Sequence, residues 1–312
     1  MPNLNYVAKR LIQLVPTLAL VLLVIFVLVR LLPGDPTSAM LGDRATDADI
    51  ARLNAQLGLD RSIPMQFLLF LERIVQGDLG TSIHLKVPVM QLILDRMPVT
   101  LALTGFAALL AVLMAVPLAF VAAMRRGRPA DTAIRGAFQI GLSMPIFYLG
   151  LVLLTVFAAQ LRWFPVGGYG DSWGDRAWHL FLPALTLALS LSAVLMRNLR
   201  ASIIEVLGAE YVDFARSKGL AARLVLGRHV LRNALISTVT LFGLSVGTLI
   251  GGAVITETVF AIPGAGRLMI DSIYGRDYPV VQGLTMAMAV LVSLVFLATD
   301  LVQAALDPRV KA

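Results

Sequence analysis

Residues that could support chemistry are sparse in this chain of 312 residues, and their spacing matches no catalytic motif. There is no cysteine, and the three histidines, His84, His179 and His229, stand far apart without a His-Glu-x-x-His pair. A Gly-x-x-x-x-Gly-Lys-Ser/Thr phosphate loop is missing, as is a Gly-x-Gly-x-x-Gly turn between a strand and a helix. We therefore predict that the chain has no catalytic residue, no metal site and no nucleotide cofactor of its own.

The most informative charged stretch is residues 200–232, which we call the elbow. Its apolar residues recur at helical spacing with Glu210, Asp213 and Lys218 between them, a pattern that predicts an amphipathic helix. Gly219 then interrupts the pattern, as a glycine at a helix end does, and a second short helical pattern follows. Two short helices bent at a glycine either rest on lipid headgroups or fit a socket on a soluble partner.

The composition is that of a membrane protein. Hydrophobic residues make up 58% of the chain and charged residues 14%, whereas a soluble domain has about 25% charged residues. A membrane-spanning helix needs ~20 mainly apolar residues. We predict an all-α integral membrane protein with six transmembrane helices, at residues 11–29, 99–124, 133–161, 180–196, 235–255 and 280–299.

The segment between the first two predicted spans, residues 33–98, is too polar to cross a membrane. We predict that it forms a small extracytoplasmic insertion with short helices at residues 46–57, 65–76 and 88–97. The middle helix follows Pro64, and proline suits the first turn of a helix. The predicted divisions of the chain are residues 1–32 (N-terminus and first helix), 33–98 (insertion), 99–306 (transmembrane core with the elbow) and 307–312 (tail).

Lysines and arginines orient the predicted helices. They are enriched in residues 125–135, in the elbow and near both chain ends. Because short basic loops stay in the cytoplasm, we predict that the elbow and both termini are cytoplasmic. The net charge of +7 then reflects membrane orientation, and nucleic-acid binding does not follow from it.

Two other classes of membrane protein fit the sequence less well. An ion-coupled secondary transporter usually places a carboxylate or histidine within the membrane to hold its coupling ion. No such residue lies inside the six apolar runs, and Glu257 and Asp300 lie at their ends, where contact with water is the simplest explanation. An intramembrane enzyme would need a Ser/His or His/Asp/Glu constellation at depth, and none is present.

Hydroxyl groups are the main polar groups within the apolar runs. The candidates for lining a solute pathway are Ser143, Ser190, Ser192, Ser245 and Thr248. Serine and threonine in membrane helices more often bond to their own helix or to a neighbour. A structural role is therefore the stronger expectation for each of them.

Several motifs resemble one family of membrane proteins along nearly the whole chain. The elbow contains GAEYVDFARSKGLAARLVLGRHVLRNAL, and further blocks are LLPGDP, LGLDRSIPMQF, QGDLGTS, WFPVGGYG, LPALTLAL, ETVFAIPGAGRL, RDYPVVQG and LDPRV. In these features the chain resembles the membrane permeases of ATP-binding-cassette (ABC) importers, in the branch that serves dipeptides, oligopeptides, glutathione and nickel. Asp213, Phe214, Ala215 and Gly219 match the Glu-Ala-Ala and glycine positions of the importer loop. Arg232 stands where many importers outside this branch have proline.

The resemblance implies a role for the elbow and a set of partners. In this family the glycine-bent loop is a coupling helix that sits in a groove of the ATPase subunit. The residues expected to act there are Glu210, Tyr211, Asp213, Ala215, Lys218, Gly219, Leu220, Arg223 and Leu224. The implied partners in a bacterial inner membrane are a homologous second permease, two ATPase subunits that bind ATP and magnesium, and an extracytoplasmic solute-binding protein.

The sequence leaves alternatives for the role of the tryptophans in the outer loops and for the identity of the solute. Trp163, Trp173 and Trp178 are expected to form an interfacial aromatic belt, with docking of the binding protein as the alternative. Peptides are the commonest solutes of this branch, so a short peptide is expected. Nickel, glutathione and other small solutes remain alternatives.

Overall fold

The described part of the chain is all-helical, as predicted. The structure is a computed structural model that describes residues 4–31, 46 and 60–306. Within these ranges the only pairing of extended segments is an isolated bridge between Thr81 and Pro88. In chain order the elements are α1 (Leu4–Leu31), α4 (Ile63–Val75), α5 (Val89–Met124), α6 (Pro129–Ser143), α7 (Ile146–Leu153), the π-helix η1 (Leu154–Gln160), α8 (Trp173–Leu207), α9 (Glu210–Ser217), α10 (Ala222–Leu224), the π-helix η2 (Val225–Leu231), α11 (Arg232–Val259), α12 (Ala265–Tyr274) and α13 (Tyr278–Leu306).

Four helical segments of the described chain are long and apolar enough to cross a membrane. They are α5, α8, the continuous run from α10 to α11 (Ala222–Val259) and α13. A fifth crossing is added if α6 and the run from α7 to η1 form one bent span. The apolar part of α1, Ile12–Val27, is shorter than these four. Length and composition thus support four or five of the six predicted crossings.

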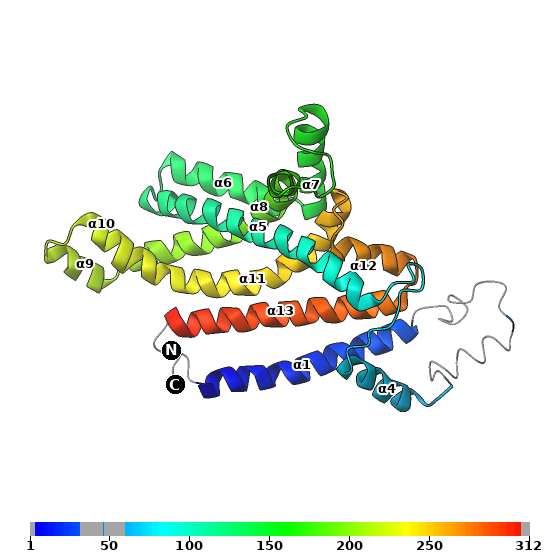
Figure 1. The fold of residues 1–312 in the computed structure, drawn as a ribbon. Coiled ribbons are helices and arrows are strands. Elements are labelled where there is room, and N and C mark those ends of the chain that lie inside the picture. The colour runs from blue at the N-terminus through cyan, green and yellow to red at the C-terminus, as the bar shows by residue number, and fades with distance from the viewer. Residues whose placement is uncertain (1–3, 32–45, 47–59, 307–312) are drawn as a thin grey trace.

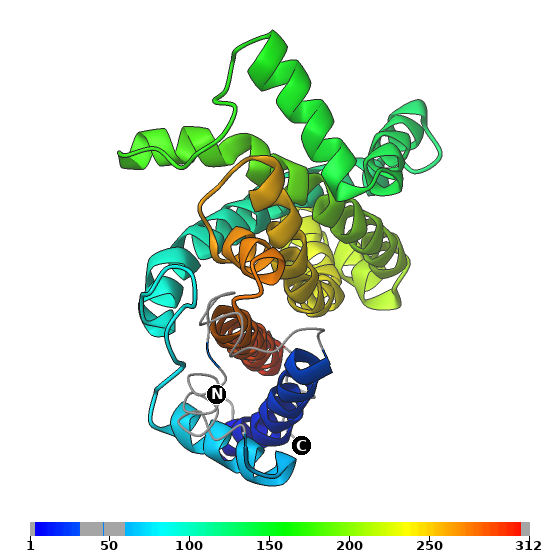
Figure 2. The same cartoon turned by 90° about the vertical axis from the view of Figure 1, so that its right-hand side faces the viewer.

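The third predicted span, residues 133–161, is wrong as a single helix. The helix α6 ends at Ser143, and its axis makes an angle of 106° with that of the following run from α7 to η1. Pro145 follows the break, and a proline pushes the preceding residue out of helical backbone. Met144 accordingly has a ψ of 133°. Figure 2 shows α7 and the start of α8 projecting away from the remaining helices.

The second predicted span begins earlier than expected. α5 is one helix from Val89, so the separate short helix predicted at residues 88–97 is in fact its first turns. The insertion was predicted to end at residue 98. That position lies inside α5, which continues through Pro98 without a break. The short helix predicted at residues 65–76 is confirmed as α4. The one predicted at residues 46–57 lies outside the described residues except for Thr46.

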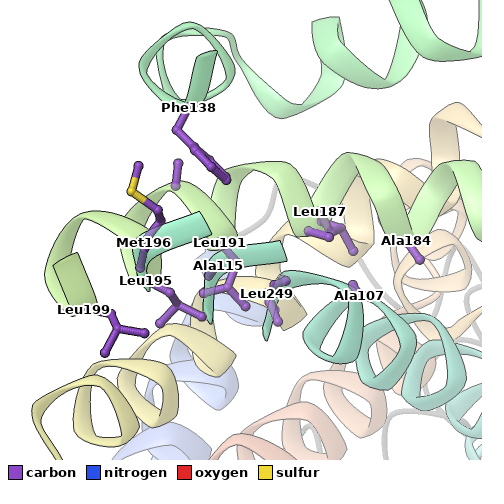
Figure 3. Packing of buried hydrophobic residues seen from close by; sticks show 14 of the residues in the cluster. Ala107, Ala115, Phe138, Ala184, Leu187, Leu191, Leu195, Met196, Leu199 and Leu249 are labelled. Atoms are coloured by element: carbon purple, nitrogen blue, oxygen red, sulfur yellow. The ribbon is translucent and has the colours of Figure 1, made fainter. Parts of the chain in front are cut away.

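α5 and α8 form the centre of the helical bundle through two complementary stripes. On α5, alanines recur every four residues and are fully buried at Ala107, Ala111, Ala115 and Ala119. On α8, the stripe consists of Leu187, Leu191, Leu195, Leu199 and Ile203. Small residues let two membrane helices approach closely, and Figure 3 shows leucines of α8 next to alanines of α5.

The remaining helices give the bundle two distinct ends. α1 lies along α13, and α4 packs on α1 through Phe67, whose ring centroid is 5.0 Å from that of Phe26. The elbow helices α9 and α10 lie at one end of the bundle, and α4 and α12 lie at the other (Figure 1). The start of α1 and the end of α13 lie at the elbow end (Figure 1).

Candidate functional site

The elbow is divided into more pieces than the sequence pattern indicates. α8 continues to Leu207, and α9 begins at Glu210 after a break at Gly208. The single amphipathic helix expected across this point is therefore wrong, because Gly208 ends the long helix before the charged residues begin. After Gly219 the second short helix is confirmed as α10, which runs through η2 directly into α11.

The bend at Gly219 is confirmed in detail. Gly219 has a φ of +77°, in the left-handed region that glycine adopts without strain. Its N–H donates to the carbonyl of Arg216 at 2.9 Å, and the N–H of Leu220 donates to the carbonyl of Ala215 at 3.4 Å. This pair of hydrogen bonds is the Schellman motif, which closes a helix on a glycine.

One side of α9 is fixed to the bundle. Val212 and Ala215 are buried in the same cluster as Ile203 of α8 and Val230 of η2. A hydrogen bond of 3.1 Å from Asn233 Nδ2 to the Tyr211 hydroxyl joins α9 to the start of α11. α9 is therefore held against η2 and the start of α11, and its buried side belongs to the core cluster of the bundle.

The other side of the elbow exposes apolar side chains. Tyr211, Phe214, Leu220 and Leu224 are all exposed, and Phe214 retains 62% of its accessible surface. They come from both sides of the bend. Apolar residues gathered on an otherwise charged surface element are typical of an interaction site.

The charged residues of the elbow lie at its surface. Asp213 pairs with Arg216 at 3.3 Å, and both side chains are more than half exposed. The ammonium nitrogen of Lys218 lies 4.4 Å from the ring centroid of Phe214. Glu210 and Arg223 are exposed as well. All nine predicted coupling residues thus lie on α9, on α10 or at the bend between them, and Ala215 alone among them is buried.

A buried ion pair beside the elbow was not predicted. Asp131, in the first turn of α6, has 1% of its side chain exposed and accepts hydrogen bonds from Nε and Nη2 of Arg200, each 2.7 Å long. The backbone N–H of Gly127 donates to the same carboxylate at 3.1 Å. The pair therefore links the first turn of α6, and the Gly127 loop before it, to α8 at the first residue of the elbow.

The surroundings of Glu257 differ from those expected from the sequence. It was expected to meet water at a span end, yet it is fully buried at the end of α11 that lies far from the elbow. Its carboxylate accepts from the hydroxyl of Thr100 at 2.6 Å and from the N–H of Arg267 at 2.9 Å. The Thr100 hydroxyl accepts from the N–H of Ala265 at 2.9 Å. Both side chains thus cap the first turn of α12, where a carboxylate is favoured.

A second buried carboxylate joins two loops at the end of the bundle away from the elbow. Asp277, between α12 and α13, is buried and accepts from the hydroxyl of Ser82 and from the N–H groups of Ile83 and His84. The loop before α5 is thereby attached to the loop before α13. The sequence offered no signal for this pairing beyond the RDYP motif, because Ser82 and Asp277 lie far apart along the chain.

The five candidate pathway hydroxyls lie on α6, α8 and α11. Ser143, Ser192, Ser245 and Thr248 each donate to a carbonyl of their own helix, at 2.6–3.0 Å. Ser190 is half-buried on α8. These bonds are those expected of a structural role. Among the described residues, no group of three His, Asp or Glu side chains could hold a metal ion.

The three tryptophans gather around the loop between η1 and α8. Trp163 and Trp178 are half-exposed, and Trp173 retains 86% of its accessible surface. Trp178 packs on Phe164 with ring centroids 4.5 Å apart, and the Arg176 guanidinium lies 5.5 Å from the Trp173 ring. An aromatic belt and a docking surface both remain compatible with this exposure.

Comparison with known proteins defines the class. Residues 115–312 match the family described as binding-protein-dependent transport system inner membrane component, and residues 3–104 match its N-terminal part. The chain is 42% identical over 309 residues to the glutathione transport system permease protein GsiC of Pectobacterium atrosepticum, covering 99% of both chains. It is 38% identical over 309 residues to the probable peptide ABC transporter permease protein y4tP of Sinorhizobium fredii, covering 98% of this chain and 99% of that protein.

The fold agrees with these matches. Inward-facing structures of the MetNI methionine ABC transporter superpose on 70% of this chain and 97% of theirs, with a TM-score of 0.58 and 18% identity. The chain is a multi-pass membrane permease. It belongs to the family of binding-protein-dependent transport system inner membrane components and is the permease subunit of a binding-protein-dependent ABC importer. Such an importer works with ATPase and solute-binding partners in general.

Proposed function

We propose that the elbow is the element through which ATPase subunits drive this permease. The observation that carries the proposal is a set of exposed apolar side chains on both sides of the bend, while Val212 and Ala215 bury the other side of α9. The exposed set is Tyr211 and Phe214 of α9, Leu220 at the bend and Leu224 of α10. The exposed apolar side chains of the elbow could pack into a groove on a soluble partner. The charged side chains around them could form ion pairs at the edge of that groove. Movement of the groove would then be transmitted to α8 and α11.

The finer architecture follows from this role. The proposed topology has six crossings, with the elbow and both termini in the cytoplasm. It is supported by the basic residues of 125–135 and by the common end that the elbow shares with the start of α1 and the end of α13. A homologous second permease completes the pathway, and two ATPase subunits bind ATP and magnesium. The chain itself is a transport subunit without an ATPase site.

A short peptide is the proposed solute, with glutathione, itself a tripeptide, as the nearest alternative. The support is the likeness to permeases named for peptide and for glutathione transport. Nickel and other small solutes stay as further alternatives. A solute-binding protein would deliver the solute at the end of the bundle that carries α4 and α12. The exposed Trp163, Trp173 and Trp178 are its candidate contacts.

The direct test is ATPase activity of the assembled importer in proteoliposomes. Candidate binding proteins are added one at a time, empty or loaded with a peptide library or with glutathione. We expect one loaded binding protein to stimulate hydrolysis, and the stimulating ligand identifies the solute. Leu220→Ser should weaken co-purification of the ATPase, whereas Leu85→Ser, at a more exposed leucine before α5, should not. Equal co-purification of the ATPase with both variants would refute the proposed role of the elbow.

A further inference from the structure

A cavity of about 350 Å³ lies between α6 and α8, next to the Asp131–Arg200 pair. Its polar lining includes Arg135 and Gln139 of α6 and Arg197 of α8. Its apolar lining includes Phe138, Leu142 and Met196. In Figure 3 the Phe138 ring points from α6 toward α8, on which Met196 lies.

The polar part of the cavity carries surplus positive charge. The carboxylate of Asp131 already receives two hydrogen bonds of 2.7 Å from Arg200 and one from the N–H of Gly127. Arg135 approaches it only to 3.4 Å and keeps half of its side chain exposed. Arg197 is exposed, and the described residues provide no ion pair for it. The guanidinium groups of Arg135 and Arg197 therefore line one cavity. The carboxylate beside it, that of Asp131, is already bonded to Arg200.

The basic and apolar parts of the cavity occupy different depths. α6 runs inward from the elbow end, so Phe138 and Leu142 lie about one and two turns deeper than Arg135. α8 runs toward the elbow, so Ala193 lies about one turn deeper than Arg197. Both helices therefore place arginine nearer the elbow end of the bundle, and apolar side chains such as Leu142 and Ala193 farther from it.

We propose that this cavity binds an anionic phospholipid. The phosphate group pairs with Arg135 and Arg197, and an acyl chain lies along Phe138 and Leu142. Basic pockets between membrane helices on the cytoplasmic side suit anionic headgroups, and arginine pairs with phosphate through two parallel hydrogen bonds. A free phosphate would use the arginines and leave the apolar wall without an occupant. The proposal does not depend on the coupling role of the elbow.

The test is native mass spectrometry of the assembled importer after addition of phosphatidylglycerol or phosphatidylethanolamine with identical acyl chains. We expect retained phosphatidylglycerol, and a loss of about 30-fold in its affinity in the double variant Arg135→Gln, Arg197→Gln. The matched control, Arg125→Gln with Arg126→Gln, removes the same charge from the neighbouring loop and should retain the lipid. The Asp131–Arg200 pair stays intact in both variants, and elution as the assembled complex verifies folding.

Four results would overturn the proposal. One is equal retention of the two lipids by the wild-type importer. Another is equal loss of phosphatidylglycerol in the double variant and in the loop control. The third is binding of soluble glycerol 1-phosphate as tight as that of the lipid, which would assign the cavity to a free anion. If no lipid is retained because the second permease covers the cavity, the proposal fails as well.

Discussion

Arg200 and Asp131, separated by 69 positions in the chain, are joined by two hydrogen bonds of 2.7 Å each. Arg200 lies two turns before the end of α8, at the first residue of the elbow, and Asp131 lies in the first turn of α6. The pair fixes the position of α8 relative to α6 at the point where α8 leads into the elbow. Under the proposed coupling role, motion that α9 passes to α8 would reach α6 through this buried pair.

Arg200→Lys should destabilise the permease, because lysine cannot make the two parallel hydrogen bonds of a guanidinium group. We expect the free energy of unfolding to fall by about 2 kcal/mol, the value of a hydrogen bond to a charged group. The measurement is thermal unfolding in detergent. Arg216→Lys, at the exposed pair with Asp213, is the control and should change stability by less than about 0.5 kcal/mol. Equal shifts in both variants would contradict the structural role of the buried pair.

Replacement of Gly219 should affect coupling according to backbone conformation. Gly219→Asn should keep most activity, because asparagine tolerates the left-handed region, whereas Gly219→Ala should cost about 1 kcal/mol of strain. No atom lies within 4 Å of the position of an added Cβ, so any loss comes from the backbone. Gly219→Pro cannot adopt a φ of +77° and should uncouple hydrolysis from uptake while membrane insertion persists.

These three variants are compared by binding-protein-stimulated ATPase activity and by solute uptake in the same vesicles. The expected order is asparagine above alanine above proline. Wild-type uptake by Gly219→Pro would remove the bend from the coupling mechanism.

Thr100→Val should loosen α12, because its hydroxyl both donates to Glu257 and accepts from the N–H of Ala265. Leaving the buried carboxylate and amide without this partner should cost about 1–3 kcal/mol. Thr258→Val is the control, since Thr258 is exposed and bonds only within α11. Hydrogen exchange of α12 distinguishes the two, and unchanged protection in Thr100→Val would show that the cap does not hold the helix.

Asp277→Asn should release the loop before α5. Its carboxylate receives hydrogen bonds from Ser82, Ile83 and His84, and an amide accepts such bonds more weakly. We expect faster hydrogen exchange at residues 80–87. Asp271→Asn, at an exposed carboxylate 3.9 Å from Arg267, should leave that exchange rate unchanged. The same rate in both variants would mean that Asp277 does not anchor the loop.

Local features of the structure could be read from the sequence. The bend of the elbow was predictable because only glycine adopts a φ of +77° readily, and Gly219 interrupts a helical pattern. α4 was predictable because Pro64 marks its first turn. The alanine stripe of α5 is also visible in the sequence as a four-residue repeat from Ala107 to Ala119.

Features that depend on contacts between distant segments could not be read in this way. Glu257 lies at the end of an apolar run, and nothing in that run shows that Thr100 of another helix encloses it. Asp131 is one charge in a basic loop until α8 brings Arg200 beside it. Proline alone does not decide where a helix ends, since Pro98 lies within a continuous helix whereas Pro145 follows a sharp break.

The central claim is that the elbow contacts an ATPase subunit, and the absence of native cysteine allows a clean test. A single cysteine is introduced by Leu220→Cys or, as the control, Leu85→Cys, and each is labelled with a benzophenone maleimide in the assembled importer. Illumination should cross-link the ATPase to position 220 and not to position 85. Cross-linking from position 85 alone, or from neither position in an importer that hydrolyses ATP, would contradict the claim.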